Sequence, residues 1–157
     1  MLEIERKYLV SRDDYLREAS HHHHIRQGYL TADGRVTVRV RIIDEEARLT
    51  IKGGSTPDGL IRSEWEYAIP VADAEERLRQ CASRSLEKVR YYVPYEGFVW
   101  EVDCFGGQLE GLVMAEVELT SPADQPALPS WLGREVTGDP RYYNAMLAQE
   151  LTPPPTT

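Results

Sequence analysis

Acidic residues recur as same-sign pairs at alternate positions along several stretches of the chain. The pairs are Glu3 with Glu5, Glu64 with Glu66, Glu101 with Asp103, and Glu116 with Glu118. In a β-strand such positions share one face and lie about 7 Å apart. Two ionised carboxylates at that separation repel each other unless a cation lies near them. Their oxygen donors suit a hard divalent cation, Mg²⁺ or Mn²⁺.

Basic residues follow the same alternation on other stretches. The set is Lys7, Arg39, Arg41, Lys52, Lys88 and Arg90. Guanidinium groups bind phosphate oxygens in pairs and ammonium groups supply point charge, so this set suits an anion with several phosphates. A divalent cation together with a polyphosphate is the arrangement of phosphoryl transfer, which needs clamping, charge neutralisation and an attacking water.

These charges alternate with apolar residues, which predicts a chain made mostly of strands. We expect strands over residues 2–10, 25–32, 35–43, 47–53, 60–69, 86–94, 98–105 and 112–120. Asp33-Gly34 predicts a hairpin turn. Short helices are expected over residues 12–19, 73–82 and 141–151, and residues 121–140, which hold several prolines, are expected to be irregular.

The charged faces allow two interpretations. An open antiparallel sheet could turn them to solvent. Same-sign pairs instead favour a closed barrel with the charges inside, and closure also removes the exposed sheet edges. The expected fold is therefore mainly β (α+β): a closed eight-stranded antiparallel β-barrel, with a few peripheral helices covering its apolar outer face.

Length and composition set the remaining bounds. The 157 residues fit one domain, expected over residues 1–151, with a disordered Pro/Thr tail over residues 152–157. The net charge of −8 argues against a nucleic-acid-binding surface. No apolar run is long enough to span a membrane, and two scattered cysteines indicate a cytoplasmic protein. The run from His21 to His24 is expected in a solvated loop, with a weak metal site as the alternative.

Several motifs occur in an order that resembles a known family. Glu3-Ile4-Glu5-Arg6-Lys7 resembles the ExExK motif that opens CYTH-domain proteins, the triphosphate tunnel metalloenzymes. Family-like stretches then follow at residues 26–30, 39–41, 49–52, 64–66, 87–91, 101–103, 116–118, 135–137 and 141–144. The resemblance covers nearly the whole chain and is greatest to the short bacterial members.

The resemblance implies a tunnel-shaped barrel that binds a divalent metal and acts on triphosphates. By position, the residues that resemble metal ligands are Glu3, Glu5, Glu116 and Glu118, with Asp103 close by. The residues that resemble a triphosphate clamp are Arg39, Arg41, Lys52, Lys88 and Arg90, with Arg141 as a further phosphate ligand at a tunnel mouth. Lys7 and Tyr29 resemble the pair proposed to help activate water.

Some of these roles have structural alternatives. Glu64, Glu66 and Glu101 are supporting carboxylates of the tunnel, and Glu64 and Glu101 either take part in the site or pair with the arginines inside the barrel. The basic residues are likewise either ligands or salt-bridge partners. Tyr29 is either catalytic or a packed aromatic residue.

The expected activity is metal-dependent hydrolysis of a terminal phosphoanhydride, with inorganic triphosphate as the favoured substrate, giving pyrophosphate and phosphate. The alternatives are an adenylate cyclase of the class IV type, a thiamine triphosphatase, and a non-catalytic module that binds polyphosphate or nucleotide. The expected partner is the small-molecule triphosphate alone. The sequence leaves monomer and homodimer equally open.

Overall fold

The computed structural model describes residues 1–32 and 35–156, and its main feature is a set of antiparallel strands. The strands are β1 (Leu2–Val10), β2 (His21–Ala32), β3 (Thr37–Ile43), β4 (Glu46–Ser55), β5 (Ile61–Ile69), β6 (Ser85–Tyr95), β7 (Phe98–Phe105), β8 (Val113–Glu118) and β9 (Leu132–Glu135). The helices are α1 (Tyr15–Glu18), α2 (Val71–Gln80) and α3 (Asn144–Glu150), with short 3₁₀ turns η1 (Ala82–Arg84), η2 (Gly107–Leu109) and η3 (Pro140–Tyr142).

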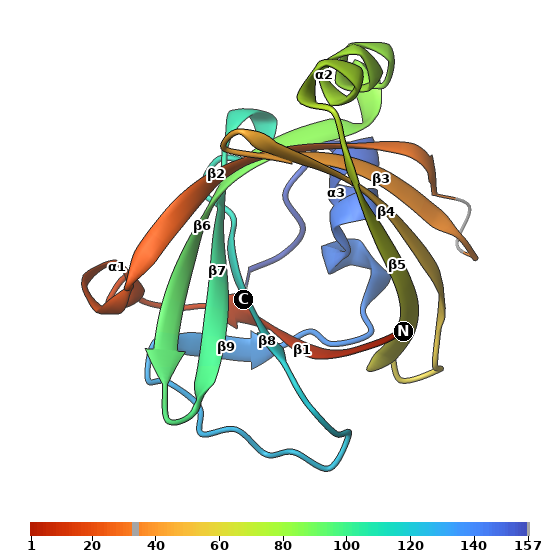
Figure 1. Cartoon of the computed structure of the whole chain (residues 1–157). Coiled ribbons are helices and arrows are strands. Elements are labelled where there is room, and N and C mark those ends of the chain that lie inside the picture. Colours follow the sequence, from red (N-terminus) through yellow and green to blue (C-terminus); the bar gives the residue numbers. More distant parts are fainter. Residues whose placement is uncertain (33–34, 157) are drawn as a thin grey trace.

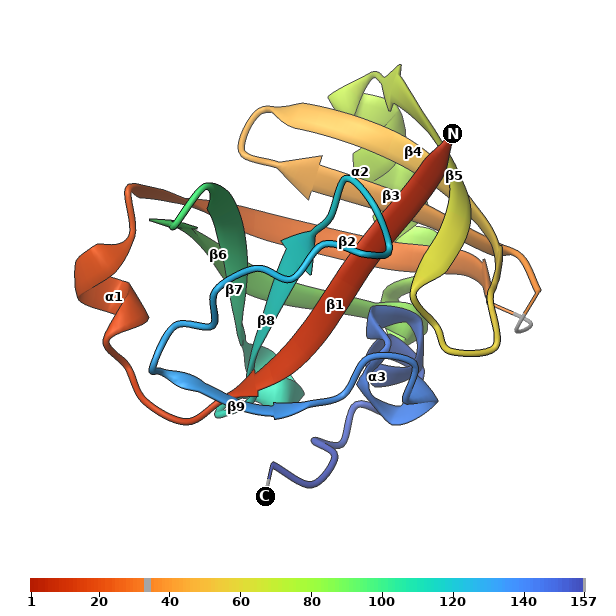
Figure 2. The same cartoon turned by 90° about the horizontal axis from the view of Figure 1, so that it is seen from below.

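Eight of these strands close into a barrel. The hydrogen-bonded order runs β5-β4-β3-β2-β6-β7-β8-β1, and β1 pairs with β5 through Leu2 to Ile4 to complete the ring. Beyond that contact, the second half of β1 pairs with β9. Figure 1 views the barrel along its axis, with α1 and α2 outside the ring of strands. Figure 2 shows α3 lying across one end of the barrel. The closed eight-stranded antiparallel barrel expected from the sequence is confirmed.

Apolar side chains on the outside of the barrel pack beneath the helices and loops, because strand alternation sends the charges to the inside. Tyr15 of α1 packs with Trp100 and Trp131, and Leu78 of α2 packs against Val40 of β3. Leu147 of α3 packs in a third cluster near the same end as η2 and η3. On β5, Trp65 and Tyr67 remain exposed.

Glycine is favoured at two places where another part of the chain approaches its Cα closely. A Cβ at Gly28 in β2 would lie 2.6 Å from the Sγ of Cys81, directly after α2. Gly138 has a φ of +79°, and a Cβ there would lie 2.4 Å from the carbonyl oxygen of Asp58. The second contact joins the β4–β5 loop to the turn before η3, and this pair of loops borders the inside of the barrel.

Three expectations need correction. The histidine run lies in β2, where backbone pairing with residues 89–92 of β6 extends the strand four residues before the expected start. The irregular segment 121–140 contains β9, which forms only because β1 offers it a free edge. The last helix begins at Asn144 and not at residue 141, since η3 comes first. The Asp33-Gly34 turn lies outside the described residues.

The described helices are all short. None has the length and apolar character needed to cross a membrane. They pack against the outer face of the barrel and across one of its ends.

Candidate active site

A cavity of about 920 Å³ lies inside the barrel. Its wall contains all of the site residues predicted from the sequence except Asp103 and Arg141. These are Glu3, Glu5, Lys7, Tyr29, Arg39, Arg41, Lys52, Glu64, Glu66, Lys88, Arg90, Glu101, Glu116 and Glu118. Thus every strand from β1 to β8 contributes at least one charged or hydroxyl side chain, as expected if alternation directs them inward.

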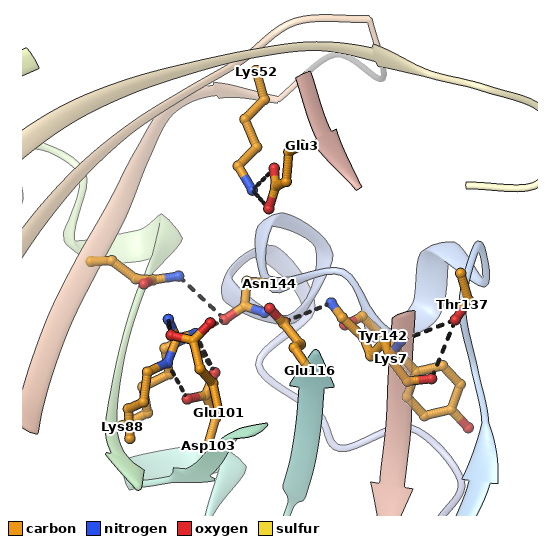
Figure 3. A network of polar contacts seen from close by, with 12 residues as sticks. Glu3, Lys7, Lys52, Lys88, Glu101, Asp103, Glu116, Thr137, Tyr142 and Asn144 are labelled. Atoms are coloured by element: carbon orange, nitrogen blue, oxygen red, sulfur yellow. Dashed lines mark hydrogen bonds and ion pairs between the residues drawn. The ribbon is translucent and has the colours of Figure 1, made fainter. Parts of the chain in front are cut away.

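Part of the cavity wall consists of cations already paired with acids. Asp103 is 2% exposed, and its carboxylate accepts hydrogen bonds from Lys88 Nζ at 2.7 Å and from Arg90 Nε at 2.7 Å. Arg90 also donates to Glu101 at 2.8 Å. We call Lys88, Arg90, Glu101 and Asp103 the paired network. Figure 3 labels Lys88, Glu101 and Asp103 of this network. Burial lowers the pKa of Lys88 to about 7, and it does so despite the opposing charge of Asp103.

Two further ion pairs lie elsewhere on the wall. Lys7 Nζ is 3.3 Å from Glu116 Oε1 and donates to the carbonyl oxygen of Tyr142 at 3.1 Å. Lys52 Nζ is 2.8 Å from Glu3 Oε2, and in Figure 3 this pair faces the other groups from the opposite side. Burial raises the pKa of Glu116, but the charges of Lys7, Arg90 and Lys88 outweigh it and leave that pKa below its usual value.

Several carboxylates on the wall repel one another. Glu5 and Glu118 are directly opposite on β1 and β8. Burial, together with the charges of Glu116 and Glu3, raises the pKa of Glu5 well above its usual value. Burial, with Glu3 and Glu101, also raises the pKa of Glu118. The acids therefore outnumber their local cations here, and a positive ion would stabilise them.

The donor set fits a hard divalent cation, because every candidate ligand is a carboxylate oxygen. Within the described residues no three His, Cys, Asp or Glu side chains are already gathered around one point. The candidates are Glu3, Glu5, Glu116 and Glu118, of which Glu3 and Glu116 are held by Lys52 and Lys7. Binding of a cation would then exchange those ion pairs for metal contacts.

Among the cavity cations predicted from the sequence, Arg39 and Arg41 differ from the others because their hydrogen-bond partners are neutral. Arg39 donates to Thr50 Oγ1 at 3.1 Å, and Arg41 donates to Gln27 Oε1 at 2.9 Å. The nearest acid to Arg39 is Glu66, at 3.8 Å. Burial and the charges of Arg39 and Arg90 lower the pKa of Arg41 to about 9, so it remains charged at neutral pH. We call Arg39 and Arg41 the open arginines, since their charge is available to an anion.

Gln27 and Asn144 are site residues to which the sequence had assigned no role. Gln27 is fully buried and donates through Nε2 to Tyr29 Oη at 2.9 Å and to Asn144 Oδ1 at 3.2 Å. Arginine has only donors, so Arg41 fixes Oε1 of Gln27 on its own side and turns the amide NH₂ toward Tyr29. Asn144 Oδ1 also accepts from Lys88 at 2.8 Å. Both residues lie within the family-like stretches 26–30 and 141–144, and this position is the sequence feature that could have indicated them.

Asp103 and Arg141 lie away from the cavity surface. Asp103 is buried behind Lys88 and Arg90. Arg141 lies in η3, where its guanidinium contacts Asp139 at 2.7 Å, and its side chain is more than half exposed. The structure thus brings together fourteen of the sixteen predicted residues.

The sequence profile of the CYTH domain matches residues 1–143, which is most of the chain. The chain belongs to the CYTH domain family. This membership implies a divalent metal, and the carboxylates of the cavity have the chemistry to hold one.

This CYTH protein is similar to two bacterial proteins named inorganic triphosphatase. One, from Acetivibrio thermocellus, is 48% identical over 148 residues, which is 94% of this chain and 93% of that protein. The other, from Nitrosomonas europaea, is 38% identical over 156 residues, covering 96% and 99% of the two chains. A crystal structure of an inorganic triphosphatase superposes with a TM-score of 0.67 at 35% identity, covering 94% of each chain.

Proposed function

We propose that this CYTH protein hydrolyses the terminal phosphoanhydride of inorganic triphosphate, giving pyrophosphate and phosphate. The observation that carries the proposal is the cavity itself, where the open arginines face a group of repelling carboxylates inside one closed barrel. One wall suits phosphate oxygens and the other suits a divalent cation. The names of the two bacterial relatives favour inorganic triphosphate over a nucleotide.

Substrate binding falls first to the open arginines. Arg39 and Arg41 are presented on adjacent inner positions of β3, so their guanidinium forks can bind neighbouring phosphates. Lys52, Lys88 and Arg90 line the same cavity and add positive charge around the chain of phosphates. Because Asp103 holds both Lys88 and Arg90, we assign it to positioning these cations and leave it out of the metal-ligand set.

The metal would be held by Glu3, Glu5, Glu116 and Glu118, and we propose Mg²⁺ or Mn²⁺ because the donors are all carboxylates. When bound, such an ion supplies charge neutralisation on phosphate oxygens and polarises the bond that breaks. The neighbouring acids that help raise the pKa of Glu5 would be offset by a bound cation, which would favour the ionised form that ligates it.

Lys7 and Tyr29 are placed to act as hydrogen-bond donors. Burial lowers the pKa of Lys7, but Glu116 and Glu5 outweigh it, so its pKa is above the usual value and the amine is protonated. Since Gln27 donates to Tyr29, the tyrosine's own proton is directed to another acceptor. Phosphoryl transfer requires mainly positioning and charge stabilisation. We therefore assign both residues to holding the reacting phosphoryl group, with the proton of the attacking water passing to the phosphate product.

The test is a panel of substrates and metals. Phosphate release is measured from inorganic triphosphate, thiamine triphosphate and ATP, each with Mg²⁺, with Mn²⁺ or with chelator. We expect metal-dependent release that is fastest from inorganic triphosphate. Absence of metal-dependent release from all three would refute the hydrolase, and binding without hydrolysis would identify a binding module. Cyclic AMP among the ATP products, separated by chromatography, would instead identify a cyclase.

A further inference from the structure

The four consecutive histidines are divided between the two faces of β2. Residues 21–24 pair with residues 92–89 of β6, so alternation places His21 and His23 on one face and His22 and His24 on the other. Gln27, which is hydrogen-bonded to Tyr29 and Arg41 of the cavity wall, lies on the same face as His21 and His23 because the strand is regular over this range. His21 and His23 therefore lie at the rim of the barrel on its inner side.

Hydrogen bonding places the proton of His21 on Nδ1. The Oγ of Ser20 is 2.8 Å from His21 Nδ1, and the same hydroxyl donates to the carbonyl oxygen of Tyr92 at 3.2 Å. A serine hydroxyl has a single proton, so when it donates that proton to Tyr92 it accepts from His21, and we adopt this arrangement. His21 Nδ1 is then the donor, and the lone pair of the neutral imidazole lies on Nε2.

His23 has the same tautomer for a different reason. Its Nδ1 contacts the carboxylate Oδ2 of Asp44, which only accepts when ionised, so the proton lies on Nδ1 and the lone pair on Nε2. The two rings are also held in place by Tyr92. His21 stacks on it at 4.4 Å and 3°, and His23 meets it edge-on at 5.3 Å. The centroids of His21 and His23 are 5.4 Å apart.

The opposite face of the strand has the same spacing of histidines but a different arrangement. His24 Nε2 lies 3.6 Å from Glu87 Oε2, beyond hydrogen-bond distance, and the nearby carboxylate favours an N–H on that nitrogen. His22 packs against the ring of Tyr91 at 5.3 Å. This pair is an internal control for the first, because it has equal composition and equal separation along the strand.

We propose that His21 and His23 form a binding site for a borderline divalent cation such as Zn²⁺, through their two Nε2 atoms. A histidine that ligates a metal characteristically has its other ring nitrogen held by a carboxylate or similar acceptor, and here Asp44 and Ser20 provide this. Imidazole nitrogens suit Zn²⁺, whereas the carboxylates of the cavity suit Mg²⁺ or Mn²⁺. The rim site is thus chemically distinct from the one inside the barrel.

The coordination shell at the rim is incomplete. In the part of the chain that the structure describes, no third histidine, cysteine or carboxylate is grouped with these two nitrogens to hold an ion. Zn²⁺ prefers four ligands, so water or a dissolved anion would fill the remaining positions. We expect a site that binds one ion per chain reversibly and leaves part of that ion open to solvent.

The first test is a Zn²⁺ competition titration against a chromophoric chelator, in excess Mg²⁺ so that the cavity carboxylates are occupied. The wild-type protein is compared with His21→Ala/His23→Ala and with His22→Ala/His24→Ala. We expect the first double variant to bind Zn²⁺ at least about tenfold more weakly and the second to bind like wild type. Equal weakening in both variants, or no wild-type binding, would overturn the proposal.

The second test reads the tautomers directly and needs no variant to fold. Long-range proton–nitrogen correlation spectra of the imidazole rings distinguish a proton on Nδ1 from one on Nε2. We expect the Nδ1 form for His21 and His23 and the Nε2 form for His24, with Zn²⁺ shifting the Nε2 signals of His21 and His23 only. An Nε2 proton on either His21 or His23 would refute the site.

Discussion

The paired network and the open arginines lie on the wall of the same cavity, yet their charges serve different ends. In the paired network Asp103 satisfies both Lys88 and Arg90, so these buried cations are neutralised by the fold itself. The open arginines donate hydrogen bonds to the neutral Thr50 and Gln27, and Arg39 has an acid, Glu66, only at 3.8 Å, so burial leaves their charge incompletely compensated. A protein retains uncompensated buried charge at a cost in stability, and this cost is offset when a ligand of opposite sign binds.

The carboxylates show the same division. Glu116 is paired with Lys7 and its pKa is lowered, whereas Glu5 is surrounded by other acids and its pKa is raised. Replacing an acid by its amide should therefore raise the stability where the acid is repelled by other acids and lower it where the acid is paired with a cation.

The largest expected effect is that of Glu5→Gln. Phosphate release should fall to background, because an amide is a poor ligand for a hard cation. The metal-free protein should at the same time become more stable above about pH 5, since Glu5 ionises more readily in the unfolded chain than in the fold, and wild type therefore loses stability as the pH rises above the unfolded-state pKa. Each kcal/mol gained would raise the unfolding midpoint by about 2–4 °C in a chain of this length. Glu118→Gln is the companion variant, and full activity in both would remove the metal-site assignment.

The matched substitution in the paired network is Asp103→Asn. It leaves the buried Lys88 without its acid and Arg90 with Glu101 alone, and breaking such a buried pair typically costs about 3–5 kcal/mol of unfolding free energy. Since the pKa of Asp103 is lowered by Arg90 and Lys88 in the fold, despite burial, its contribution is present above about pH 4 and is lost as the pH falls. Denaturant titrations across pH measure both effects. A variant as stable as wild type would contradict the assignment of Asp103 to positioning.

Arg41→Lys tests whether the open arginines serve the ligand and not the fold. Loss of the guanidinium fork should raise the KM for inorganic triphosphate by about ten- to hundredfold, the usual range for a hydrogen bond to a charged group. The unfolding midpoint should change little. Arg90→Lys is the control, because it weakens the contacts with Asp103 and Glu101 and should lower stability as well. Equal destabilisation by both variants would contradict the distinction between the open arginines and the paired network.

Gln27→Glu should produce a smaller effect of about tenfold on kcat, with little change in KM. The carboxylate retains the shape and the contact with Arg41, but it cannot donate to Tyr29, whose proton would turn toward it. Tyr29→Phe and the double variant complete a cycle of steady-state measurements. If Gln27 acts through Tyr29, the double variant is no slower than Tyr29→Phe; additive losses would show that it does not.

The smallest expected effect is that of Arg141→Ala. Its guanidinium contacts Asp139 on the surface, and exposed ion pairs of this kind contribute at most about 1 kcal/mol. Activity should remain within about twofold of wild type. A large rise in KM would instead support the role of phosphate ligand that the family resemblance implies for Arg141.

The fold and most of the site followed from local alternation. Same-sign pairs such as Arg39 with Arg41 and Glu116 with Glu118 predicted the closed barrel and the two kinds of wall, because a strand sends alternate side chains to one face. The start of β2, the presence of β9 and the position of η3 could not be read in the same way. The first two depend on partners distant in sequence, Tyr92 for His21 and the free edge of β1 for β9.

The sequence by itself determined which residues face the inside of the barrel and what chemistry they can offer. The tertiary structure alone decided which of those charges are neutralised. The sequence predicts both Lys88 and Arg41 as bases inside the barrel. In the structure Lys88 donates to the acid Asp103 on a neighbouring strand, whereas Arg41 donates to the neutral amide of Gln27. Charge compensation depends on distances of a few ångströms between different strands, and strand register and closure fix those distances.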